Sequence, residues 1–393
     1  MIYADRMKSL KPSDIREVMK IISKNPGTIS FAGGLPDPEL FPVDAISKAV
    51  SGVFKNDATR ALQYGATQGE SGLKEEIVKL MKREGVDTSI EEISVTHGSQ
   101  QGISLTSMMF LNPGDVVLTE NPSYLGAFSA YKPYEIKFIG VNGDEDGMIM
   151  EDLEKKIKEI KNVKMIYVIP NFQNPTGKTW SAERRKKLVE IANEYNLPIV
   201  EDNAYGELRF EGDRIPSVKS FDTEGRVLYL GSFSKILAPG LRVGWVCSSK
   251  EINTKFEYVK YGCDLQNTEV SQLMVERFLK ENDLDEHLDN IKDVYGRRRD
   301  LMINEIKRCF PEEAKYYYPE GGMFVWVELP DKINTRELLK KAVEKKVAFV
   351  PGGSFYPGGD CESSMRLNFS TMQDESIVKG IQILGELLAK EIK

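Results

Sequence analysis

The fold class is indicated most clearly by one stretch, VKMIYVIPNFQNPTGKTWSAERRKKLVEIANEYNLPIVED (163–202). It opens with a short apolar run (163–170), the pattern of a strand that is buried on both faces of a sheet. A segment of helical period follows Ser181, which is a favourable helix N-cap, and a second apolar run ends at Asp202. A strand, a helix and a second strand in this order predict a βαβ unit with two parallel strands.

The same alternation of apolar runs and helical patterns continues from about residue 90 to residue 250. Five further runs are interpreted as buried strands: EISVTHG (92–98), DVVLTE (115–120), EIKFIG (135–140), RVLYLGS (226–232) and VGWVCSS (243–249). These segments favour a mostly parallel sheet with helices on both faces. After about residue 285 a long charged helix leads to GGMFVWVEL (321–329), VAFVPGG (347–353) and SMRLNFS (364–370), a pattern that suits a smaller α+β domain.

Composition narrows the classes of function. The chain has 393 residues, enough for about two domains, with 41% hydrophobic and 29% charged residues. A net charge of −7 with interspersed signs argues against a nucleic-acid-binding surface, and the run RRR (297–299) is interpreted as a solvated helix face. Four cysteines without a CxxC pair and two distant histidines predict isolated thiols and no metal site. With no signal peptide and no membrane-spanning apolar run, we expect a cytoplasmic protein.

Two loops follow predicted strands at the edge of the sheet where α/β proteins bind ligands. After 92–98 a Gly turn opens a helix, so Ser99, Gln100 and the backbone N–H groups around them offer an anion site, although such a turn is often only a cap. The loop PNFQNPTGKTW (170–180) is not a phosphate-binding P-loop, because Phe172 stands where that motif needs glycine. In this loop Asn174 is, by itself, compatible with an ordinary turn.

A third loop, GSFSKILAPGLRVGW (231–245), follows another predicted strand. Ser232 and Ser234 flank Lys235 closely enough to hold one anion together with Arg242. A lysine that is partly desolvated at a strand end can have a lowered pKa and form a Schiff base with a carbonyl compound. The alternative is a surface lysine whose stem lies along the protein.

Taken together, these segments resemble the pyridoxal-phosphate-dependent class I and II aminotransferases, the fold type I aspartate aminotransferase superfamily, and most closely their 2-aminoadipate, kynurenine and multi-substrate branch. The resemblance covers nearly the whole chain. Its motifs stand in order: FAGGLPD (31–37), QYGATQG (63–69), HGSQQG (97–102), NPSY (121–124), PNFQNPTG (170–177), EDNAYGEL (201–208), GSFSKILAPGLRVGW (231–245) and MRLNFS (365–370).

The resemblance implies an α/β fold of the PLP-transferase type, with a mostly parallel central sheet flanked by helices. A large cofactor-binding domain would span 47–284, and a small substrate-closing domain would combine 1–46 with 285–393. The implied cofactor is pyridoxal 5′-phosphate, and the implied partners are small-molecule substrates and a second copy of the chain, with no nucleic acid and no membrane.

The resemblance also implies a role for each residue around the cofactor ring. Lys235 would form the Schiff base and then move the proton between the amino-acid Cα and the cofactor. Asp202 would face the pyridine nitrogen and keep it protonated. Tyr205 and Asn174 would hydrogen-bond the phenolic oxygen, and Tyr124 would stack on the ring.

The remaining implied contacts are to the phosphate and the substrate. The phosphate would be held by Ser99, Gln100, Ser232, Ser234 and Arg242. Tyr64 of the neighbouring subunit would reach it as well and would also lie near the substrate. Arg366 would bind the substrate α-carboxylate through both arms of its guanidinium, with Asn174 beside it, and FAGGLPD would close over the pocket with the Gly34 backbone near that carboxylate.

The expected activity is an aminotransferase that takes an amino group from an L-amino acid (2-aminoadipate, aromatic, kynurenine-like or branched-chain) and passes it to a 2-oxo acid such as 2-oxoglutarate by a ping-pong mechanism. A C–S β-lyase on the same scaffold is the main alternative. A cofactor-binding sensor of a transcription regulator is a weaker one, because about 30 residues before FAGGLPD are too few for a further domain.

Two residues stay without an assigned chemical role. His97 is interpreted as a packing residue. Arg16, on an expected N-terminal helix, could reach an acidic substrate side chain, although a surface position is favoured.

Overall fold

The larger of two main sheets contains all seven strands predicted between residues 90 and 250. The computed structural model describes residues 2–8, 10, 14–359 and 361–392, without the side chains of 14–16 and 19. Within this part the sheet has the order β2-β10-β9-β8-β7-β3-β4, and β10 alone runs antiparallel to its neighbours. The strands are β2 (Ile93–Thr96), β3 (Val116–Glu120), β4 (Lys137–Val141), β7 (Val163–Val168), β8 (Ile199–Asn203), β9 (Val227–Ser232) and β10 (Gly244–Cys247). The expected α/β class is confirmed.

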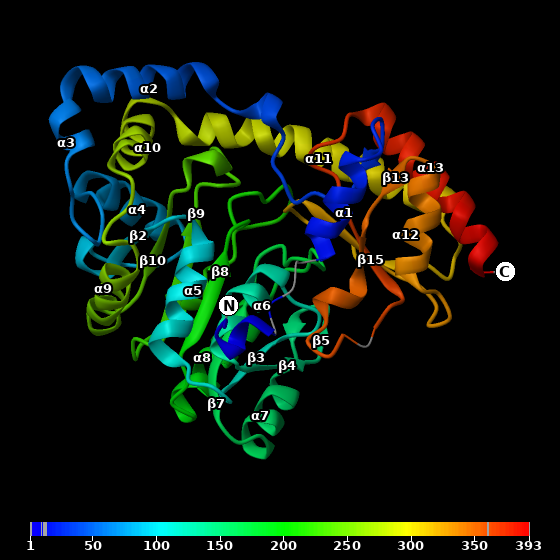
Figure 1. Cartoon of the computed structure of the whole chain (residues 1–393), viewed down its shortest axis with the longest axis horizontal. Helices are drawn as coiled ribbons and strands as arrows, with labels where there is room; N and C mark the ends of the chain where they lie inside the picture. The colour runs from blue at the N-terminus through cyan, green and yellow to red at the C-terminus, as the bar shows by residue number, and fades with distance from the viewer. Residues whose placement is uncertain (1, 9, 11–13, 360, 393) are drawn as a thin grey trace.

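Helices cover both faces of this sheet (Figure 1). Along β8 the side chains alternate: Val200 packs in the same apolar cluster as Ile103 of α5, and Ile199 packs in the cluster that contains Leu188 of α8. Because both faces are buried, the strands appear in the sequence as uninterrupted apolar runs. The helices of this region are α2 (Val43–Asn56), α3 (Ala58–Leu62), α4 (Ser71–Arg83), α5 (Ser99–Phe110), α6 (Leu125–Tyr131), α7 (Met150–Glu159), α8 (Ala182–Glu194), α9 (Lys250–Asp264) and α10 (Glu269–Glu281).

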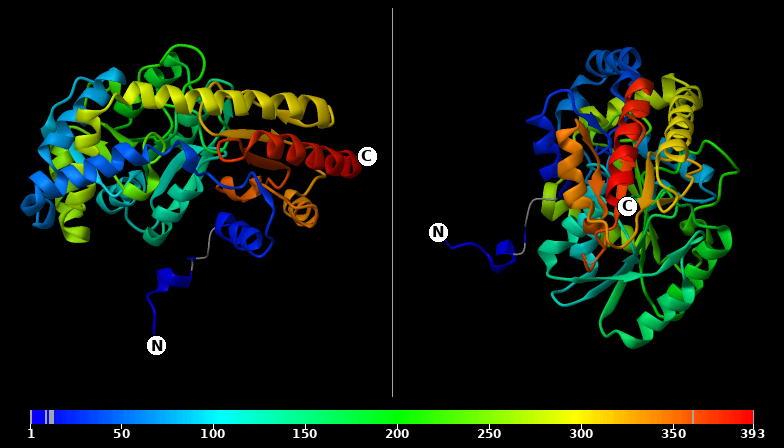
Figure 2. Two further views of the ribbon diagram at one scale, coloured as in Figure 1. Left: turned by 90° about the horizontal axis from the view of Figure 1, so that it is seen from above. Right: turned by 90° about the vertical axis from the view of Figure 1, so that its right-hand side faces the viewer.

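A second sheet, of order β11-β12-β15-β14, lies to the side of the first (Figure 1). The long helix α11 extends from the first sheet to the second and packs against the C-terminal helix α13 (Figure 2). Short strands near the two chain ends, β1 (Ile29–Ser30) and β13 (Val347–Ala348), pair in parallel. The other elements are α1 (Asp14–Ser23), β5 (Gly143–Asp144), β6 (Gly147–Met148), α11 (Leu284–Cys309), β11 (Lys315–Tyr316), β12 (Phe324–Glu328), α12 (Thr335–Glu344), β14 (Val350–Pro351), β15 (Ser364–Asn368) and α13 (Asp374–Ile392).

Residues 29–30 therefore lie beside residues 347–348, although the two segments are far apart in the sequence. The residue bounds of the two domains stay a prediction. None of the helices in the described part of the chain is long and apolar enough to cross a membrane.

The interpretation of the RRR run as a solvated face is wrong for two of its three arginines. Arg297 is exposed, but Arg298 and Arg299 are 3% and 2% exposed. Successive helix residues point about 100° apart, so a helix that packs on two sides buries neighbours in sequence. Arg298 donates to Asp37 at 2.6 Å, which ties α11 to the N-terminal segment. The guanidinium of Arg299 lies 4.5 Å from the ring centre of Tyr318.

Candidate active site

A cavity of about 380 Å³ opens at the carboxyl ends of the parallel strands, between the two sheets. Every residue to which the sequence assigned a site role, except Tyr64, lines this one cavity. Its lining consists of Gly34, Ser99, Gln100, Tyr124, Ile169, Asn174, Asp202, Ala204, Tyr205, Ser232, Ser234, Lys235, Pro239, Arg242 and Arg366. Segments more than 300 residues apart in sequence therefore build a single site.

Lys235 follows β9 and projects its amine into the cavity. Its Nζ donates a hydrogen bond to the Gly34 carbonyl at 2.7 Å, which brings the FAGGLPD segment to the reactive amine. Burial lowers the pKa of Lys235 to about 8, and the positive charges of Arg366 and Arg242 act in the same direction. About a tenth of the amine is thus neutral and nucleophilic at pH 7, far more than for an ordinary lysine.

The lowered pKa of Lys235 predicts the pH dependence of its reaction with an aldehyde. We expect the apoprotein, treated with propionaldehyde and a hydride donor, to be alkylated at Lys235 at a rate that rises with pH and is half-maximal near pH 8. Ordinary exposed lysines, with a pKa of about 10.4, should keep gaining reactivity well above that pH. Peptide mapping by mass spectrometry measures both in one sample. Equal profiles for Lys235 and the surface lysines would contradict the lowered pKa.

Asp202, near the end of β8, carries an unsatisfied oxygen at the cavity. One carboxylate oxygen, Oδ2, accepts a hydrogen bond from the Tyr167 hydroxyl at 2.7 Å. The other, Oδ1, is buried without a hydrogen-bond partner. Burial raises the pKa of Asp202 to about 6, so at neutral pH a mostly charged carboxylate faces the cavity. It fits a ligand that presents a positively charged N–H group, as a protonated pyridine ring does.

Several lining residues of the cavity form an anion cradle. Helix α5 begins at Ser99, directly after Gly98, which has a φ of 70°. A Cβ at Gly98 would lie 2.6 Å from Arg242 Nη2, so glycine lets this guanidinium approach the helix start, where it donates to the His97 carbonyl at 2.8 Å. Ser232 Oγ donates to Ser234 Oγ at 2.9 Å beside it. Helix N–H groups, hydroxyls and a guanidinium are donors that suit a phosphate.

The cavity lining also includes a buried arginine, Arg366 of β15, which is 1% exposed. Its guanidinium lies 4.2 Å from the ring centre of Phe324. It donates to Asn174 Oδ1 at 2.8 Å and to the Ala32 carbonyl at 2.9 Å. Burial lowers its pKa to about 10, and no carboxylate pairs with it in the described part of the chain. A buried cation without a counter-ion, facing a cavity, suits a ligand carboxylate.

Comparison with known proteins agrees with this chemistry. The profile of the family described as "Aminotransferase class I and II" matches residues 31–384. The chain belongs to the class I and II aminotransferases. It is 42% identical to aromatic-amino-acid aminotransferase 1 of Thermococcus litoralis, covering 100% of this chain and 95% of that protein. It is 38% identical to 2-aminoadipate transaminase of Thermus thermophilus, covering 96% and 94%.

A solved structure of similar size supports the same conclusion. The chain is similar to Pyrococcus horikoshii kynurenine aminotransferase, solved in complex with PMP, with a TM-score of 0.95 and 41% identity over 100% of this chain and 98% of that one. The protein is therefore an aminotransferase, as the sequence predicted.

The other predicted residues of this aminotransferase occupy distinct places. Tyr124 is partly buried just before α6, and the burial of its hydroxyl raises its pKa to about 12. Asn174 Nδ2 donates to the Tyr205 hydroxyl at 3.2 Å, so Asn174 links that hydroxyl to the arginine of β15. Gln100 Nε2 donates to the Gly126 carbonyl at 2.9 Å. Tyr64 is 78% exposed and lies outside the cavity of its own chain.

His97, interpreted from the sequence as a packing residue, also makes polar contacts. Its half-buried imidazole lies 3.3 Å from Asp264 Oδ2, and its carbonyl accepts from the arginine of the anion cradle. Burial lowers the pKa of His97. The side chain of Arg16 lies outside the described residues.

Sequence reasoning missed two groups of the site. Tyr167, the hydroxyl partner of Asp202, stands inside the apolar run VKMIYVIP and reads as a core residue. The rings of Phe324 and Phe355, which flank Arg366, likewise look like ordinary strand and loop hydrophobics. Only the three-dimensional contact with a known polar partner distinguishes them.

Proposed function

We propose that this aminotransferase moves the amino group of an L-amino acid to a 2-oxo acid, 2-oxoglutarate, in a ping-pong cycle. The observation that carries the proposal is the single cavity in which a weakly basic amine, an unpartnered carboxylate oxygen, an anion cradle and a buried guanidinium converge. The cofactor is pyridoxal 5′-phosphate. When bound, it withdraws electrons from the amino-acid Cα, so that a proton can leave that carbon.

The residues of the chain divide this work. The cradle of Ser99, Ser232, Ser234 and Arg242 holds the phosphate. Asp202 Oδ1 would accept a hydrogen bond from the pyridine N–H and keep that nitrogen protonated, and Tyr124 would hold the ring.

The reacting end of the substrate is handled by three further groups. Lys235, in its neutral form, would take the proton from the substrate Cα and move it toward the cofactor. Arg366 binds the α-carboxylate, with Asn174 beside it. The FAGGLPD segment, whose Gly34 carbonyl accepts a hydrogen bond from Lys235 Nζ, would shield the proton transfer from water.

The donor that this cavity favours is a large apolar or aromatic L-amino acid. Of the lining residues described, the cations are Lys235, Arg242 and Arg366, and each has a role above. Ile169, Ala204 and Pro239 add apolar surface. A second substrate carboxylate, as in 2-aminoadipate or 2-oxoglutarate, would need one more donor, for which Arg16 is the candidate. Relatives named for aromatic amino acids and for 2-aminoadipate support both donor classes.

Arg366 gives a test of substrate recognition. We expect Arg366→Ala to raise KM for the amino acid and to lower kcat/KM. The loss of transition-state stabilisation should be roughly 3–5 kcal/mol, the cost of losing one partner of a buried ion pair. That corresponds to a factor of about 10² to 10³ or more. Arg297→Ala, which removes an exposed arginine of α11, is the matched control and should leave both constants unchanged. An unchanged KM in the Arg366 variant would contradict the assignment.

A second copy of the chain is the proposed partner. Exposed apolar side chains gather around the loop that carries Tyr64: Leu62, Tyr64, Met108, Tyr258, Tyr261 and Leu265. This loop joins the end of α9 through a hydrogen bond from Gly65 N to Gln266 Oε1 at 2.6 Å. Met108 touches Cys263 of α9 at 3.3 Å between the two sulfurs. A clustered exposed patch of this kind is typical of an interface.

Mixing two inactive variants tests whether Tyr64 acts across that interface. Tyr64→Ala lacks the hydroxyl supplied to the partner, and Lys235→Ala lacks the reactive amine. In a mixed dimer one site receives Lys235 from one subunit and Tyr64 from the other, so about a quarter of all sites should regain activity after subunit exchange. If Tyr64 served its own chain, mixing would restore nothing. Refolding each variant alone is the control.

The requirement for an oxo acid separates the proposed reaction from its alternatives. Steady turnover of an aromatic amino acid should stop without 2-oxoglutarate and follow parallel-line ping-pong kinetics with it. Pyruvate and ammonia released from a cysteine conjugate, with no oxo acid present, would instead identify a C–S β-lyase. Specific DNA binding without amino transfer would identify a sensor. A cytoplasmic location stays a prediction.

A further inference from the structure

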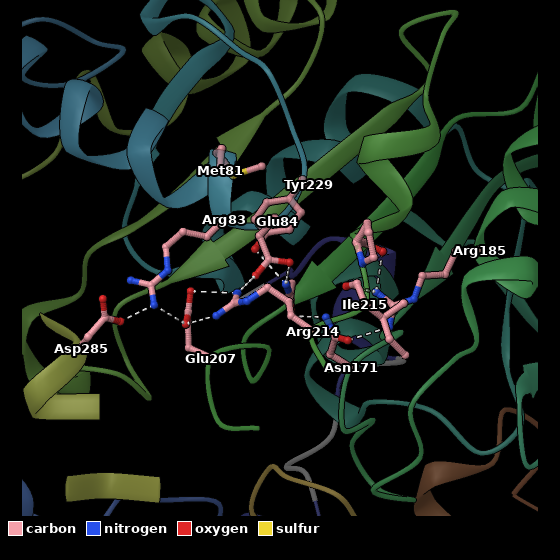
Figure 3. Close-up of polar contacts among 12 residues, drawn as sticks. Met81, Arg83, Glu84, Asn171, Arg185, Glu207, Arg214, Ile215, Tyr229 and Asp285 are labelled. Carbon is pink, nitrogen blue, oxygen red and sulfur yellow. Dashed lines mark hydrogen bonds and ion pairs between the residues drawn. The ribbon is translucent and has the colours of Figure 1, made fainter. Parts of the chain in front are cut away.

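The proposed chemistry does not use a polar network that includes Glu84, Arg214 and Tyr229 (Figure 3). Side chains alternate along a strand, so Asp202 faces the cavity and its neighbour Asn203 faces the opposite side of β8. Asn203 Nδ2 donates to the Tyr229 hydroxyl at 2.8 Å and to Glu84 Oε2 at 3.2 Å. Its Oδ1 accepts from Asn171 Nδ2 at 3.1 Å. The end of β8 is thus held from behind by side chains of three other segments.

Glu84, at the end of α4, is the anionic centre of this network and is 4% exposed. Its Oε1 accepts from Arg214 Nη1 at 2.7 Å, and its backbone carbonyl accepts from Ser217 N at 3.0 Å. Arg214 Nη2 also donates to Glu207 at 2.6 Å. One carboxylate therefore ties α4 both to the strand end that carries Asp202 and to the segment that follows Tyr205.

The turn that contains Gly206, between Asn203 and Arg214, is packed too tightly to move independently. A Cβ at Gly206 would lie 2.5 Å from Asn203 Oδ1, so the turn wraps directly over the Asn203 amide. Glu84, Asn203 and Tyr229 all line a small cavity of about 20 Å³. Ala204 and Ser232 line both this cavity and the active-site cavity, so a single layer of residues divides them. A shift of Asn203 must therefore move Tyr205 as well.

The charges around Glu84 oppose one another. Arg214 touches it from the 206–217 segment, with Glu207 of the same segment behind, and Glu201 of β8 and Arg185 of α8 act from a distance. The charge of Glu84 in turn helps to raise the pKa of the nearby Tyr229 hydroxyl of β9. Burial is the largest influence and raises the pKa of Glu84 from an ordinary 4.5 to about 7, although Arg214 lowers it. The charged form of Glu84 is thus costly to the folded protein at the pH where the enzyme would work.

We propose that Glu84 is a positioning residue of this aminotransferase, whose carboxylate, paired with Arg214, fixes Asn203 and through it the orientation of Asp202 and Tyr205 in the active site. The inference rests on the proposed function. Its consequence is that the ionised form of Glu84 holds the site in its productive geometry, and that protonation weakens the pair with Arg214 and loosens the Asp202–Tyr205 segment. The buried charge of Glu84 lowers the stability of the folded protein but keeps Asp202 and Tyr205 correctly oriented.

The test is Glu84→Gln, which keeps the shape and mimics the protonated acid. Near pH 6 the variant and the wild type should have the same kcat, because the wild-type acid is mostly protonated there. Near pH 8.5 the kcat of the variant should be lower by at least about threefold, with KM for the amino acid nearly unchanged. The absorbance titration of the bound cofactor should lose a transition near pH 7 in parallel.

Thermal unfolding of the apoprotein gives a readout that needs no cofactor. A raised acid pKa means that the unfolded chain binds fewer protons than the folded one between pH 4.5 and about 7, so the wild type loses stability as pH rises through that window. Glu84→Gln lacks this loss, and its Tm should therefore gain on the wild type as pH rises. A Tm difference that is independent of pH would overturn the assigned ionisation.

Two further variants keep the proposal decidable. Asp285→Asn removes the exposed far end of the same chain of ion pairs, which reaches Glu207 through Arg83, and should leave kcat and its pH profile unchanged. If Glu84→Gln does not fold, Arg214→Gln removes the same pair from its more exposed side and should reproduce the loss of kcat near pH 8.5. A loss of kcat that is equal at both pH values would mean a merely structural role. If Asp202→Ala has full activity, the proposed function itself fails; if only Glu84→Gln is silent, the inference alone fails.

Discussion

A Lys235→Ala variant is expected to bind pyridoxal 5′-phosphate and to show no amino transfer. Of the lysines described in the structure, Lys235 is the one that lines the active-site cavity, and burial with two neighbouring arginines holds its pKa near 8. No other side chain there combines a nucleophilic amine with a position beside Gly34, near which the substrate α-carboxylate should lie. Loss of proton transfer by a positioned side chain costs about 10²- to 10⁴-fold in rate, and loss of the covalent link to the cofactor adds to this.

Single-turnover kinetics with a saturating amino acid measure this loss, and equilibrium dialysis measures cofactor binding. Because the phosphate cradle is untouched, the variant should retain most of its cofactor affinity. A small amine such as ethylamine, which can occupy the space left by the side chain, should restore part of the rate. Lys74→Met removes another buried lysine, from α4, and is the control for general damage. Near-normal transamination by the alanine variant would end the proposed mechanism.

Asp202→Ala is expected to have the second-largest effect. Asp202 Oδ1 is buried and unpartnered, and Asp202 lines the cavity. No other carboxylate of the described cavity lining could replace it. Without it the pyridine nitrogen loses its counter-charge, and we expect kcat to fall by about 10²- to 10³-fold, the usual cost of removing one preorganised electrostatic group. The fold should survive, since a carboxylate whose pKa is raised by burial is costly to the folded state.

Tyr167→Phe is the matched comparison for Asp202. It removes the 2.7 Å hydrogen bond to Oδ2 and leaves the carboxylate in place. Its effect should be closer to the worth of one hydrogen bond, about 1 kcal/mol or up to tenfold in rate. Circular dichroism and Tm check that both variants are folded. Equal activity of Asp202→Ala and the wild type would remove the ring-nitrogen assignment.

The part of the fold that could be predicted is the part in which burial produces a continuous apolar run in the sequence. The inner strands of the larger sheet were visible because they are covered on both faces, which leaves a run such as RVLYLGS without polar alternation. The edge strand β4 is only partly buried and was visible as a shorter apolar run. Most of the cavity lining was also predictable, because it lies on loops at the carboxyl ends of these strands, and a parallel sheet brings those loops together at one edge. The roles of Lys235 and Arg366, in contrast, came from the resemblance of whole motifs and not from either residue alone.

The parts that sequence could not reveal depend on contacts between distant segments. Arg298 and Arg299 looked solvated because three consecutive arginines usually are, yet α11 packs on two sides. Glu84 stands at a helix end among other charges, where an exposed carboxylate is the ordinary expectation. Only the fold places Arg214, 130 residues further along the chain, against it. Burial of a polar side chain by partners so distant leaves no pattern in the sequence.

The most direct measurement of the central claim is the absorbance spectrum of the purified holoenzyme through one half-reaction. Addition of an aromatic L-amino acid or L-2-aminoadipate, without oxo acid, should convert the pyridoxal form of the cofactor to the pyridoxamine form, with one oxo acid released per site. Addition of 2-oxoglutarate should then restore the first spectrum. A holoenzyme that binds the cofactor but never converts it with any of a panel of amino acids would contradict the assignment of this cavity to amino transfer.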